Sequence, residues 1–392
     1  MRIGIMGAPV NNPNHGCMAL AYSLVADLNE IEKKLGKNFE YVFFDWIYEE
    51  NKFEMMADIL NIDRKKLIYA PYTLKDDLVH MLYHCKKYMQ MKAEIKKCDC
   101  IIDVTEGDSF SDIYGDRWFV GRTRIKLMIE KMGIPLMLAP QTYGPFMKDR
   151  NKKLAVKSIK KADIVLARDK KSLDLIKELT NRNAEFTTDL AFLLPYGETI
   201  SDTTNKVKVG INFSYLLSCN DEMKNRKFSL SLDYEKYMEL LTERLLQENF
   251  EIHLISHVDS DYEVHKKIKE KYPKIKLADK LSNPIEAKTY ISKMDVFIGA
   301  RMHGTIAAFT TGVAVIPTAY SEKFANLFRS LSYEPLVDLT KLEIDEAVEL
   351  TLNYTRNYKK LKMDVSRCIL DNQEIIESTK TKLLEWVEHV GL

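Results

Sequence analysis

A short segment in the last third of the sequence sets three cationic side chains in an otherwise apolar background. The stretch GARMHGTIAAFTTGVAVIPTAYSEKF covers residues 299–324 and contains Arg301, His303 and Lys323. The planar guanidinium of arginine can bind a carboxylate or a phosphate through two parallel hydrogen bonds, and histidine exchanges a proton near neutral pH. The segment therefore predicts a site that holds an anion beside an acid–base group.

The elements around these residues predict how they are positioned. DVFIGA and VAVIPTA are typical of buried strands, and HGTIAAFTTG between them is typical of a helix. Arg301 and His303 then stand at a strand end and a helix start, where backbone amides favour an anion. Lys323 follows the next strand and can reach the same edge. His303 alone could be a capping residue, but three cations at successive strand ends favour a pocket.

An acidic loop follows a predicted strand in the stretch CDCIIDVTEGDSFSDIYGDRW. Its acidic residues are Asp103, Glu106, Asp108, Asp112 and Asp116. We expect Asp108 and Asp112 to hydrogen-bond sugar hydroxyls or to take a proton from one. Nothing in the loop reproduces a calcium-binding pattern, and Mg²⁺ usually needs only one or two carboxylates, so no metal is predicted. The alternative is a structural loop, with helix caps and tight turns at Gly107 and Gly115.

Three further strand-to-helix turns carry candidate residues. The first, APVNNPNHG, lacks the G-x-G-x-x-G spacing of dinucleotide binding, so no nicotinamide or flavin cofactor is expected. Asn14 in this turn could contact an anion or a sugar hydroxyl, or could simply cap the helix. In APQTYGPF, Gln141 and Tyr143 offer an amide and a phenol. In ARDKKS, Arg168 could bind an anion or pair with its neighbour Asp169.

The overall composition bounds the classes of function. The chain has 392 residues, of which 46% are hydrophobic and 29% charged, as in an ordinary globular protein of two domains. Its 58 basic and 57 acidic residues leave a net charge of +1, which gives no reason to expect a nucleic-acid partner. The six cysteines show no zinc-ligand spacing, and no run of 18 apolar residues occurs. The N-terminus does not read as a secretory signal, so a cytoplasmic location is expected.

Short apolar runs alternate with amphipathic stretches along most of the chain, which predicts an α/β fold with parallel sheets. The polar stretch PYGETISDTTNK interrupts this rhythm and is predicted to link two domains. We therefore expect a Rossmann-like domain over 1–195, a second over 207–342, and C-terminal helices over 343–392 that pack across both. Ligands of such folds bind beyond the carboxyl ends of the strands, in a cleft that both domains face.

One helix-like stretch, VHMLYHCKKYMQMKAEIKKC over residues 79–98, is basic and amphipathic. Such a helix can lie on an anionic membrane, as a lipid-linked substrate would require. The ordinary interpretation, which we favour, is one apolar face on the sheet and lysines in water. A peripheral contact with the inner face of the membrane stays open.

Taken in order, the motifs resemble those of the polysaccharide pyruvyl transferase family. The resemblance rests on N-x-G before the first helix, EGDSFSD, Q-x-x-GPF, ARD-x-x-S, TTDLAF, and R-x-H-G with Tyr320 and Lys323 downstream. It covers about residues 14 to 324. It implies two Rossmann-like domains in a GT-B-like arrangement, phosphoenolpyruvate as donor, and a pyruvate ketal formed on a sugar or lipid-linked glycan precursor. Where the family often has two or three glycines, this chain reads Thr105-Glu106-Gly107.

The resemblance and the residue chemistry together give a set of expected roles. Catalysis is expected from His303 as acid and Asp108 as its partner on the acceptor side. Donor contacts are expected from Arg301, Lys323, Arg168 and Gly304. Acceptor contacts are expected from Asn14, Asp112, Gln141 and Tyr143. No cofactor or metal is expected. Two alternatives stay open: a nucleotide-sugar glycosyltransferase of the same architecture, and a non-catalytic glycan-binding protein.

Overall fold

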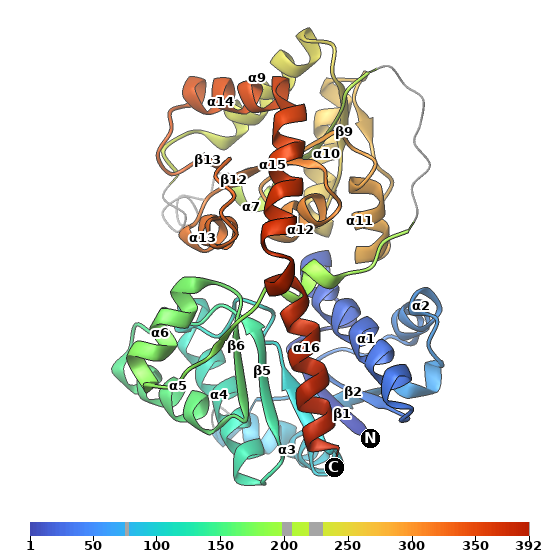
Figure 1. Cartoon of the computed structure of the whole chain (residues 1–392), viewed down its shortest axis with the longest axis vertical. Helices are drawn as coiled ribbons and strands as arrows, with labels where there is room; N and C mark the ends of the chain where they lie inside the picture. Colours follow the sequence, from blue (N-terminus) through green and yellow to red (C-terminus); the bar gives the residue numbers. More distant parts are fainter. Residues whose placement is uncertain (75–77, 198–205, 219–229, 392) are drawn as a thin grey trace. The chain divides into compact units, whose positions relative to one another are not determined.

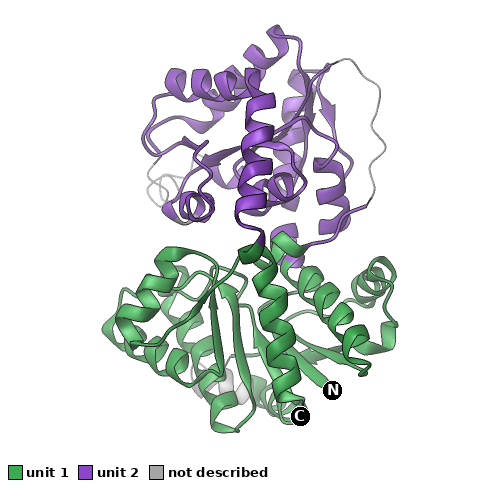
Figure 2. Ribbon diagram, in the orientation of Figure 1, with its two compact units in different colours: residues 1–12, 20–193, 374–392 green, residues 13–19, 194–373 purple. Residues whose placement is uncertain are grey.

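The structure is a computed structural model that describes residues 1–74, 78–197, 206–218 and 230–391, with backbone alone at 78–83 and Lys323. It divides into two compact units (Figure 2). The first comprises residues 1–12, 20–193 and 374–392, and the second residues 13–19 and 194–373. Most of the predicted linker, 198–205, lies outside the described residues.

The first unit contains a parallel seven-stranded sheet of order β3-β2-β1-β4-β5-β6-β7 (Figure 1). Each central strand is buried along almost its whole length, as expected for a parallel sheet covered on both faces. The strands are β1 (Arg2–Met6), β2 (Glu40–Asp45), β3 (Leu67–Pro71), β4 (Cys100–Asp103), β5 (Leu136–Gln141), β6 (Ile164–Ala167) and β7 (Glu185–Phe186).

Helices and short 3-10 turns connect and flank these strands (Figure 1). They are α1 (His15–Leu35), α2 (Glu50–Leu60), η1 (Arg64–Lys66), α3 (Leu78–Ile95), η2 (Asp112–Tyr114), α4 (Asp116–Lys131), α5 (Asp149–Lys161), α6 (Lys170–Thr180) and η3 (Leu190–Leu193).

The second unit contains a parallel six-stranded sheet of order β10-β9-β8-β11-β12-β13. Its strands are β8 (Lys208–Asn212), β9 (Glu251–Leu254), β10 (Lys276–Leu277), β11 (Val296–Gly299), β12 (Ala314–Ala319) and β13 (Val337–Asp338). Its helices before the C-terminal segment are α7 (Tyr215–Ser218), α9 (Tyr234–Gln247), α10 (Asp259–Lys271), α11 (Pro284–Ile291), α12 (Met302–Thr310) and α13 (Glu322–Ser330).

The predicted fold class is confirmed, because each sheet is parallel, carries flanking helices and reverses its strand order once. The reversal falls between β1 and β4 in the first sheet and between β8 and β11 in the second. Such points are where ligands of doubly wound folds bind. Asn283 caps α11 by accepting a hydrogen bond from the Glu286 amide at 3.0 Å, with Pro284 in the first turn.

The C-terminal segment forms three helices, α14 (Ile344–Arg356), α15 (Tyr358–Asp371) and α16 (Gln373–Val390). Contacts assign α14 and α15 to the second unit and α16, from Glu374 onward, to the first. Residues 13–19 count with the second unit because Asn14 pairs with Val258 in an antiparallel bridge and the His15 amide donates to the His257 carbonyl at 3.0 Å.

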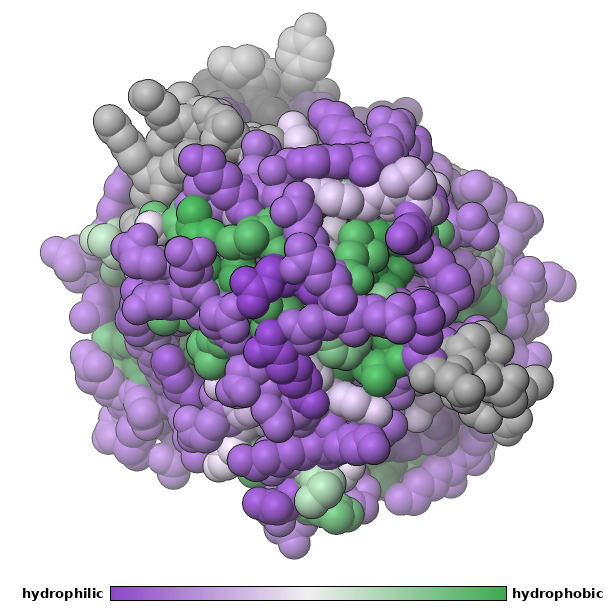
Figure 3. Space-filling view, turned by 90° about the horizontal axis from the view of Figure 1, so that it is seen from above, coloured by the Kyte–Doolittle hydropathy of each residue, from purple (hydrophilic) through white to green (hydrophobic). Residues whose placement is uncertain are grey.

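The surface gives no separate signal of membrane contact. The face in Figure 3 is mainly hydrophilic, with hydrophobic residues in small separate areas. Among the described residues, no helix is long and apolar enough to cross a bilayer. In α3, Met91 and Ile95 are buried while Lys86, Lys87 and Lys92 are exposed, which is the ordinary arrangement of a helix on a sheet. A peripheral membrane contact stays a prediction.

One buried cation predicts how stability depends on pH. Lys288 in α11 is buried, its Nζ donates to the Leu194 carbonyl at 2.7 Å, and burial lowers its pKa to about 7. The unfolded chain, with an ordinary lysine pKa of about 10.4, binds more protons between pH 7 and 10. The free energy of unfolding should therefore rise as the pH goes from 7 to 10, because the folded protein no longer buries a charge at Lys288. Below pH 7 Lys288 is charged in both states, and its burial destabilises the fold by the full amount.

Lys288→Met should raise the melting temperature at pH 6, by the equivalent of at least about 1 kcal/mol. This advantage should shrink as pH approaches 10. Thermal unfolding at several pH values measures it, with the exposed Lys293→Met as the matched control. An advantage that stays constant from pH 6 to 10 would contradict the buried-charge explanation.

Candidate functional site

The predicted anion site lies at the start of α12 in the second unit. Strand β11 ends at Gly299, Arg301 is the N-cap residue of α12, and no side chain of Arg301 caps the helix. Arg301 and His303 are half-buried and Gly304 is buried. The first-turn amides and the positive end of the helix therefore meet a guanidinium and an imidazole at one strand end.

Arg301 is held by a buried carboxylate that sequence reasoning missed. Its Nε and Nη2 donate to the two carboxylate oxygens of Asp261 at 3.0 and 2.7 Å, and Asp261 is fully buried. Burial disfavours the charge on Arg301, but hydrogen bonds and attraction from Asp261 outweigh this and raise the pKa of Arg301. The pair fixes the plane of the guanidinium while its Nη1 edge takes no part in the Asp261 contact.

His303 lies directly against the turn that opens α1. A Cβ atom added to Gly16 would come within 2.3 Å of the His303 Nδ1 and 2.9 Å of its Cβ. Glycine is required there because the whole side chain of His303 would otherwise have to move. The N-x-G and R-x-H-G motifs, far apart in the sequence, thus meet in one place.

A second histidine, His257, belongs to the same cluster. It follows β9, is 3% exposed, and neither of its ring nitrogens has a hydrogen-bond partner among the described residues. Its ring lies 5.9 Å from that of His15. Burial, and then the nearby His15, His303 and Arg301, hold the pKa of His257 well below its ordinary value. It is therefore a neutral imidazole with one donor and one acceptor nitrogen inside a polar cluster.

Lys323 and Asn14 are the other predicted site residues of the second unit. Lys323 falls in the first turn of α13, and its side chain lies outside the described residues. Asn14 precedes α1, and its Oδ1 accepts a hydrogen bond from the Gly16 amide at 2.9 Å. Asn14 therefore caps the helix, the alternative that the sequence left open, while its predicted contact with an acceptor stays a prediction.

Arg168 lies in the first unit, at the end of β6. Its Nη1 pairs with Asp189, its Nε donates to the Thr142 hydroxyl at 2.9 Å, and the residue is 2% exposed. Burial opposes its charge, but Asp189 and two further acids raise the pKa of Arg168. Its partner is thus Asp189 of TTDLAF rather than Asp169, whose side chain instead caps α6 at Ser172. A donor contact from Arg168 stays a prediction.

The acidic loop packs against the Arg168 side chain at Gly107. A Cβ on Gly107 would come within 2.9 Å of the Arg168 Nη1. Three consecutive residues, Thr105, Glu106 and Gly107, have φ values of 46°, 53° and 78°. This is the left-handed region that favours glycine, so the backbone follows a path suited to the glycines that the resemblance leads one to expect.

The loop's acidic residues have different surroundings. Asp112 is buried and accepts hydrogen bonds from the amides of Met147 and Lys148, at 2.8 and 3.1 Å, and from Asn151. Burial alone would raise the pKa of Asp112, but these hydrogen bonds to the charged carboxylate outweigh it and lower the pKa. Asp108 is half-buried and accepts from the Tyr114 hydroxyl. Asp112 thus anchors the next loop, whereas Asp108 stands nearer to solvent.

Gln141 and Tyr143 lie inside the first unit. Gln141 is fully buried and its Nε2 donates to the carbonyls of Ala139 and Asp103. Tyr143 is 3% exposed, and burial raises the pKa of its hydroxyl well above the ordinary value. The acceptor roles expected of both stay predictions that these contacts do not support. In the part of the chain that the structure describes, no three acidic, histidine or cysteine residues form a metal-binding group.

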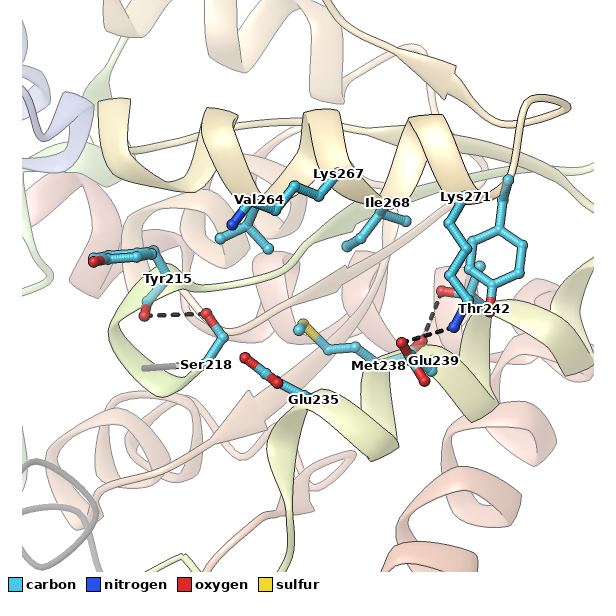
Figure 4. A pocket seen from close by; sticks show the side chains of 11 residues that line it. Tyr215, Ser218, Glu235, Met238, Glu239, Thr242, Val264, Lys267, Ile268 and Lys271 are labelled. Atoms are coloured by element: carbon cyan, nitrogen blue, oxygen red, sulfur yellow. Dashed lines mark hydrogen bonds and ion pairs between the residues drawn. The ribbon is translucent and has the colours of Figure 1, made fainter. Parts of the chain in front are cut away.

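A cavity of about 410 Å³ opens elsewhere in the second unit, between α7, α9 and α10 (Figure 4). Met238, Val264 and Ile268 supply apolar walls, and Lys271 pairs with Glu239 at 2.8 Å at one end. The sequence-predicted site residues do not line it. One of its lining residues, Tyr215, contacts the cluster, because its amide donates to Asp261 at 2.9 Å.

The sequence matches a family model described as polysaccharide pyruvyl transferase over residues 14–322. No curated protein matches it by sequence. Among solved structures, UDP-GlcNAc 2-epimerase from Neisseria meningitidis, bound to UDP-GlcNAc, superposes with a TM-score of 0.55 at 12% identity. That alignment covers 95% of this chain and 100% of the epimerase.

Two further structures have the same two-sheet architecture. UDP-GlcNAc 2-epimerase from Methanocaldococcus jannaschii has a TM-score of 0.56 at 12% identity and covers 91% of this chain and 92% of its own. HepE from Anabaena, in complex with UDP and glucose, has a TM-score of 0.56 at 11% identity, with 99% of both chains covered. At such low identity these similarities establish the GT-B-type fold alone.

Gly16→Ala tests the contact between the two motifs. The added methyl group must displace His303, so the variant should lose about 1–3 kcal/mol of stability. The ring resonances of His303 should shift in NMR spectra while those of the exposed His389 of α16 stay in place. Gly197→Ala is the matched control, since a Cβ there comes no closer than an ordinary 3.5 Å to Thr289. Equal melting temperatures for both variants would contradict the close contact.

Arg301→Ala tests the buried ion pair. The change leaves the Asp261 carboxylate buried without its cation, which should cost about 3–5 kcal/mol. Asp261→Ala in the same chain should restore part of that loss, because it removes the uncompensated charge. The exposed pair Arg244 and Glu349 is the control, and Arg244→Ala should change stability by less than about 1 kcal/mol. Thermal unfolding measures all three variants, and a double variant no more stable than Arg301→Ala would contradict the coupling.

Proposed function

Because the chain belongs to the polysaccharide pyruvyl transferase family, we propose that it transfers pyruvate from phosphoenolpyruvate to two hydroxyls of one sugar. The acceptor is a glycan or a glycan precursor, the product is a pyruvate ketal, and phosphate is released. The chemistry needs no cofactor.

The observation that carries the proposal is the cluster at the start of α12. Phosphoenolpyruvate bears a carboxylate and a phosphate, and a protein of net charge +1 must gather cationic and N–H groups locally to hold it. Arg301 supplies a guanidinium whose plane Asp261 fixes, and the helix start supplies amides. Gly304 keeps the first turn free of a side chain. Lys323 is proposed as a further contact with the donor.

The reaction balances as follows. The CH2 carbon of the enol, C3, takes one proton, which makes C2 electrophilic. One sugar hydroxyl adds its oxygen to C2 and loses its proton. The second hydroxyl then attacks C2, loses its proton, and the C2–O bond to phosphate breaks. The net result is one ketal and one inorganic phosphate, so the site must supply an acid at C3 and a base for the hydroxyls.

His303 is proposed as the acid and His257 as its positioning residue. The His303 ring is confined on one side by Gly16, and the neutral ring of His257 belongs to the same cluster. Imidazole can hold and give a proton near pH 7. Asp108, in the first unit, is proposed as the base on the acceptor side because it is half-buried, unlike Asp112, and accepts from a tyrosine hydroxyl rather than from the backbone amides that Asp112 holds.

A nucleotide-sugar glycosyltransferase is the alternative function. The observation in its favour is that two of the named structural neighbours hold UDP-GlcNAc, or UDP with glucose. Arg301 and the helix start would then hold a diphosphate. Protection against thermal unfolding by phosphoenolpyruvate, compared with a panel of nucleotide sugars, separates the two. Protection by a nucleotide sugar alone would favour the alternative.

The origin of the proton gives the sharpest test of the reaction. In D2O, the CH2 of phosphoenolpyruvate should become a CH2D group in the product, visible by mass spectrometry, because the acid exchanges its proton with solvent. His303→Ala should lower turnover at least about a hundredfold, within the usual range for general acid catalysis, while phosphoenolpyruvate still binds. His389→Ala, an exposed histidine of α16, is the control and should keep full turnover.

The possible outcomes have distinct meanings. A product methyl group without deuterium would exclude the enol donor. Near-normal turnover in His303→Ala would keep the donor but assign the proton to another residue.

A further inference from the structure

A separate small cavity in the first unit has the lining of a carbohydrate site. It has a volume of about 270 Å³ and lies between the acidic loop and the first turns of α4. Its lining residues are Glu106, Ser109, Ser111, Tyr114, Trp118, Phe119 and Arg122. It thus combines aromatic rings, hydroxyls and a pair of opposite charges just beyond the end of β4.

One exposed tryptophan, Trp118, lines this cavity, and a second, Trp46, packs against it. Trp118 is 46% exposed and Trp46, which follows β2, is 36% exposed. Their ring centroids lie 5.3 Å apart at an interplanar angle of 75°, and Trp46 also contacts the ring of Tyr72 at 4.9 Å. These edge-to-face contacts hold the rings in place. Large aromatic side chains that are rigid yet exposed are typical of a binding surface rather than a core.

Charged groups fix the other side of the cavity. The Arg122 guanidinium lies over the Trp118 ring, 5.0 Å from its centroid, and its Nη2 donates to Glu106 at 2.7 Å. Burial opposes the charge on Arg122, but Glu106 outweighs it and raises the pKa of Arg122. The Ser109 hydroxyl also donates to Glu106, at 3.2 Å. The cavity therefore offers planar, oriented donors and acceptors beside an apolar ring.

We propose that this cavity binds one sugar ring of the acceptor glycan, with an apolar C–H face of the ring on Trp118 and its hydroxyls toward Glu106, Arg122 and Ser109. The inference rests on the proposed function for the identity of the glycan as acceptor. A pyranose has one apolar face and a rim of hydroxyls, which matches an aromatic wall opposite paired charges. Trp46 extends the apolar surface beside that ring.

The charges disfavour an anionic occupant. Arg122 is already paired with Glu106, and Asp108 accepts from Tyr114, which itself lines the cavity. A phosphate or nucleotide would meet the Glu106 carboxylate there, and the one cation among the lining residues, Arg122, is already paired with it. A neutral polyol gains hydrogen bonds from the same groups without that repulsion.

Tryptophan fluorescence gives a direct test that does not require turnover. The chain has three tryptophans, and Trp386 in α16 is 5% exposed, so a Trp386→Phe background leaves Trp46 and Trp118 as reporters. Lactose, N-acetyllactosamine, cellobiose and diacetylchitobiose are titrated without phosphoenolpyruvate, together with any saccharide that stimulates phosphate release. At least one should give a saturable change in the reporter signal.

Variants then assign the binding to the cavity. Trp118→Ala, read by isothermal calorimetry, should weaken binding of that saccharide at least about tenfold, and raise its KM by a similar factor without changing the KM for phosphoenolpyruvate. Trp118→Phe should restore part of the loss, because a ring remains. Tyr196→Ala, an aromatic of the second unit that is 46% exposed, is the control and should bind normally.

The outcomes separate the subsite from the function. Saccharide binding lost in Trp118→Ala, with no phosphate released from phosphoenolpyruvate by any acceptor, would keep the subsite and reject the pyruvyl transfer. Phosphate release with an unchanged acceptor KM in Trp118→Ala would keep the transfer and overturn the subsite. A reporter signal that no saccharide changes would also overturn it.

Discussion

The carboxylate of Asp261 is the constraint on which the second unit's site depends. It binds the Arg301 guanidinium through both oxygens, and it also accepts from the Tyr215 amide and the Asn212 side chain. Arg301 follows β11, Asn212 is the last residue of β8 and Tyr215 lies just after it. Asp261 itself follows β9. One buried charge therefore ties three neighbouring strand ends together. Without this carboxylate, nothing in the pair would fix the orientation of the Arg301 side chain. With it, the guanidinium has a fixed plane at the start of α12.

Much of this arrangement was predictable, because the spacing of apolar residues along a strand or helix and the residue types at its ends are local features of the sequence. The alternation of apolar runs predicted parallel sheets with flanking helices, and the ends of parallel strands brought Arg301 and His303 to one edge. The partners were not predictable. Asp261 and His257 reach this edge only because β9 lies beside β8, and β8 beside β11, in the strand order. That order comes from long-range packing, and the sole hint in the sequence was that HVDSD directly follows a strand-like run.

The same limit explains why charged residues at strand ends were harder to interpret than the fold. Arg168 and Asp112 are polar residues in predicted loops, and a ligand contact and a buried internal contact give them the same pattern. The structure separates them: Arg168 is paired with Asp189 from a motif 21 residues away, and Asp112 accepts from amides of the loop after β5. Burying such a group is favourable only when its partners are supplied, and a sequence does not tell whether a partner is protein or ligand.

The acidic loop adds a last step, because two residues other than glycine take positive φ values where the resemblance leads one to expect glycine. Non-glycine residues with positive φ cost about 1 kcal/mol or more each, and Thr105 and Glu106 both carry that cost. Each is offset by a contact that glycine could not make: the Thr105 hydroxyl accepts from the buried Lys126 at 3.0 Å, and Glu106 pairs with Arg122. Glu106 thus carries backbone strain and also lines the cavity that we propose as a sugar site. Its ion pair with Arg122 ties the shape of the loop to the side chains that line that cavity.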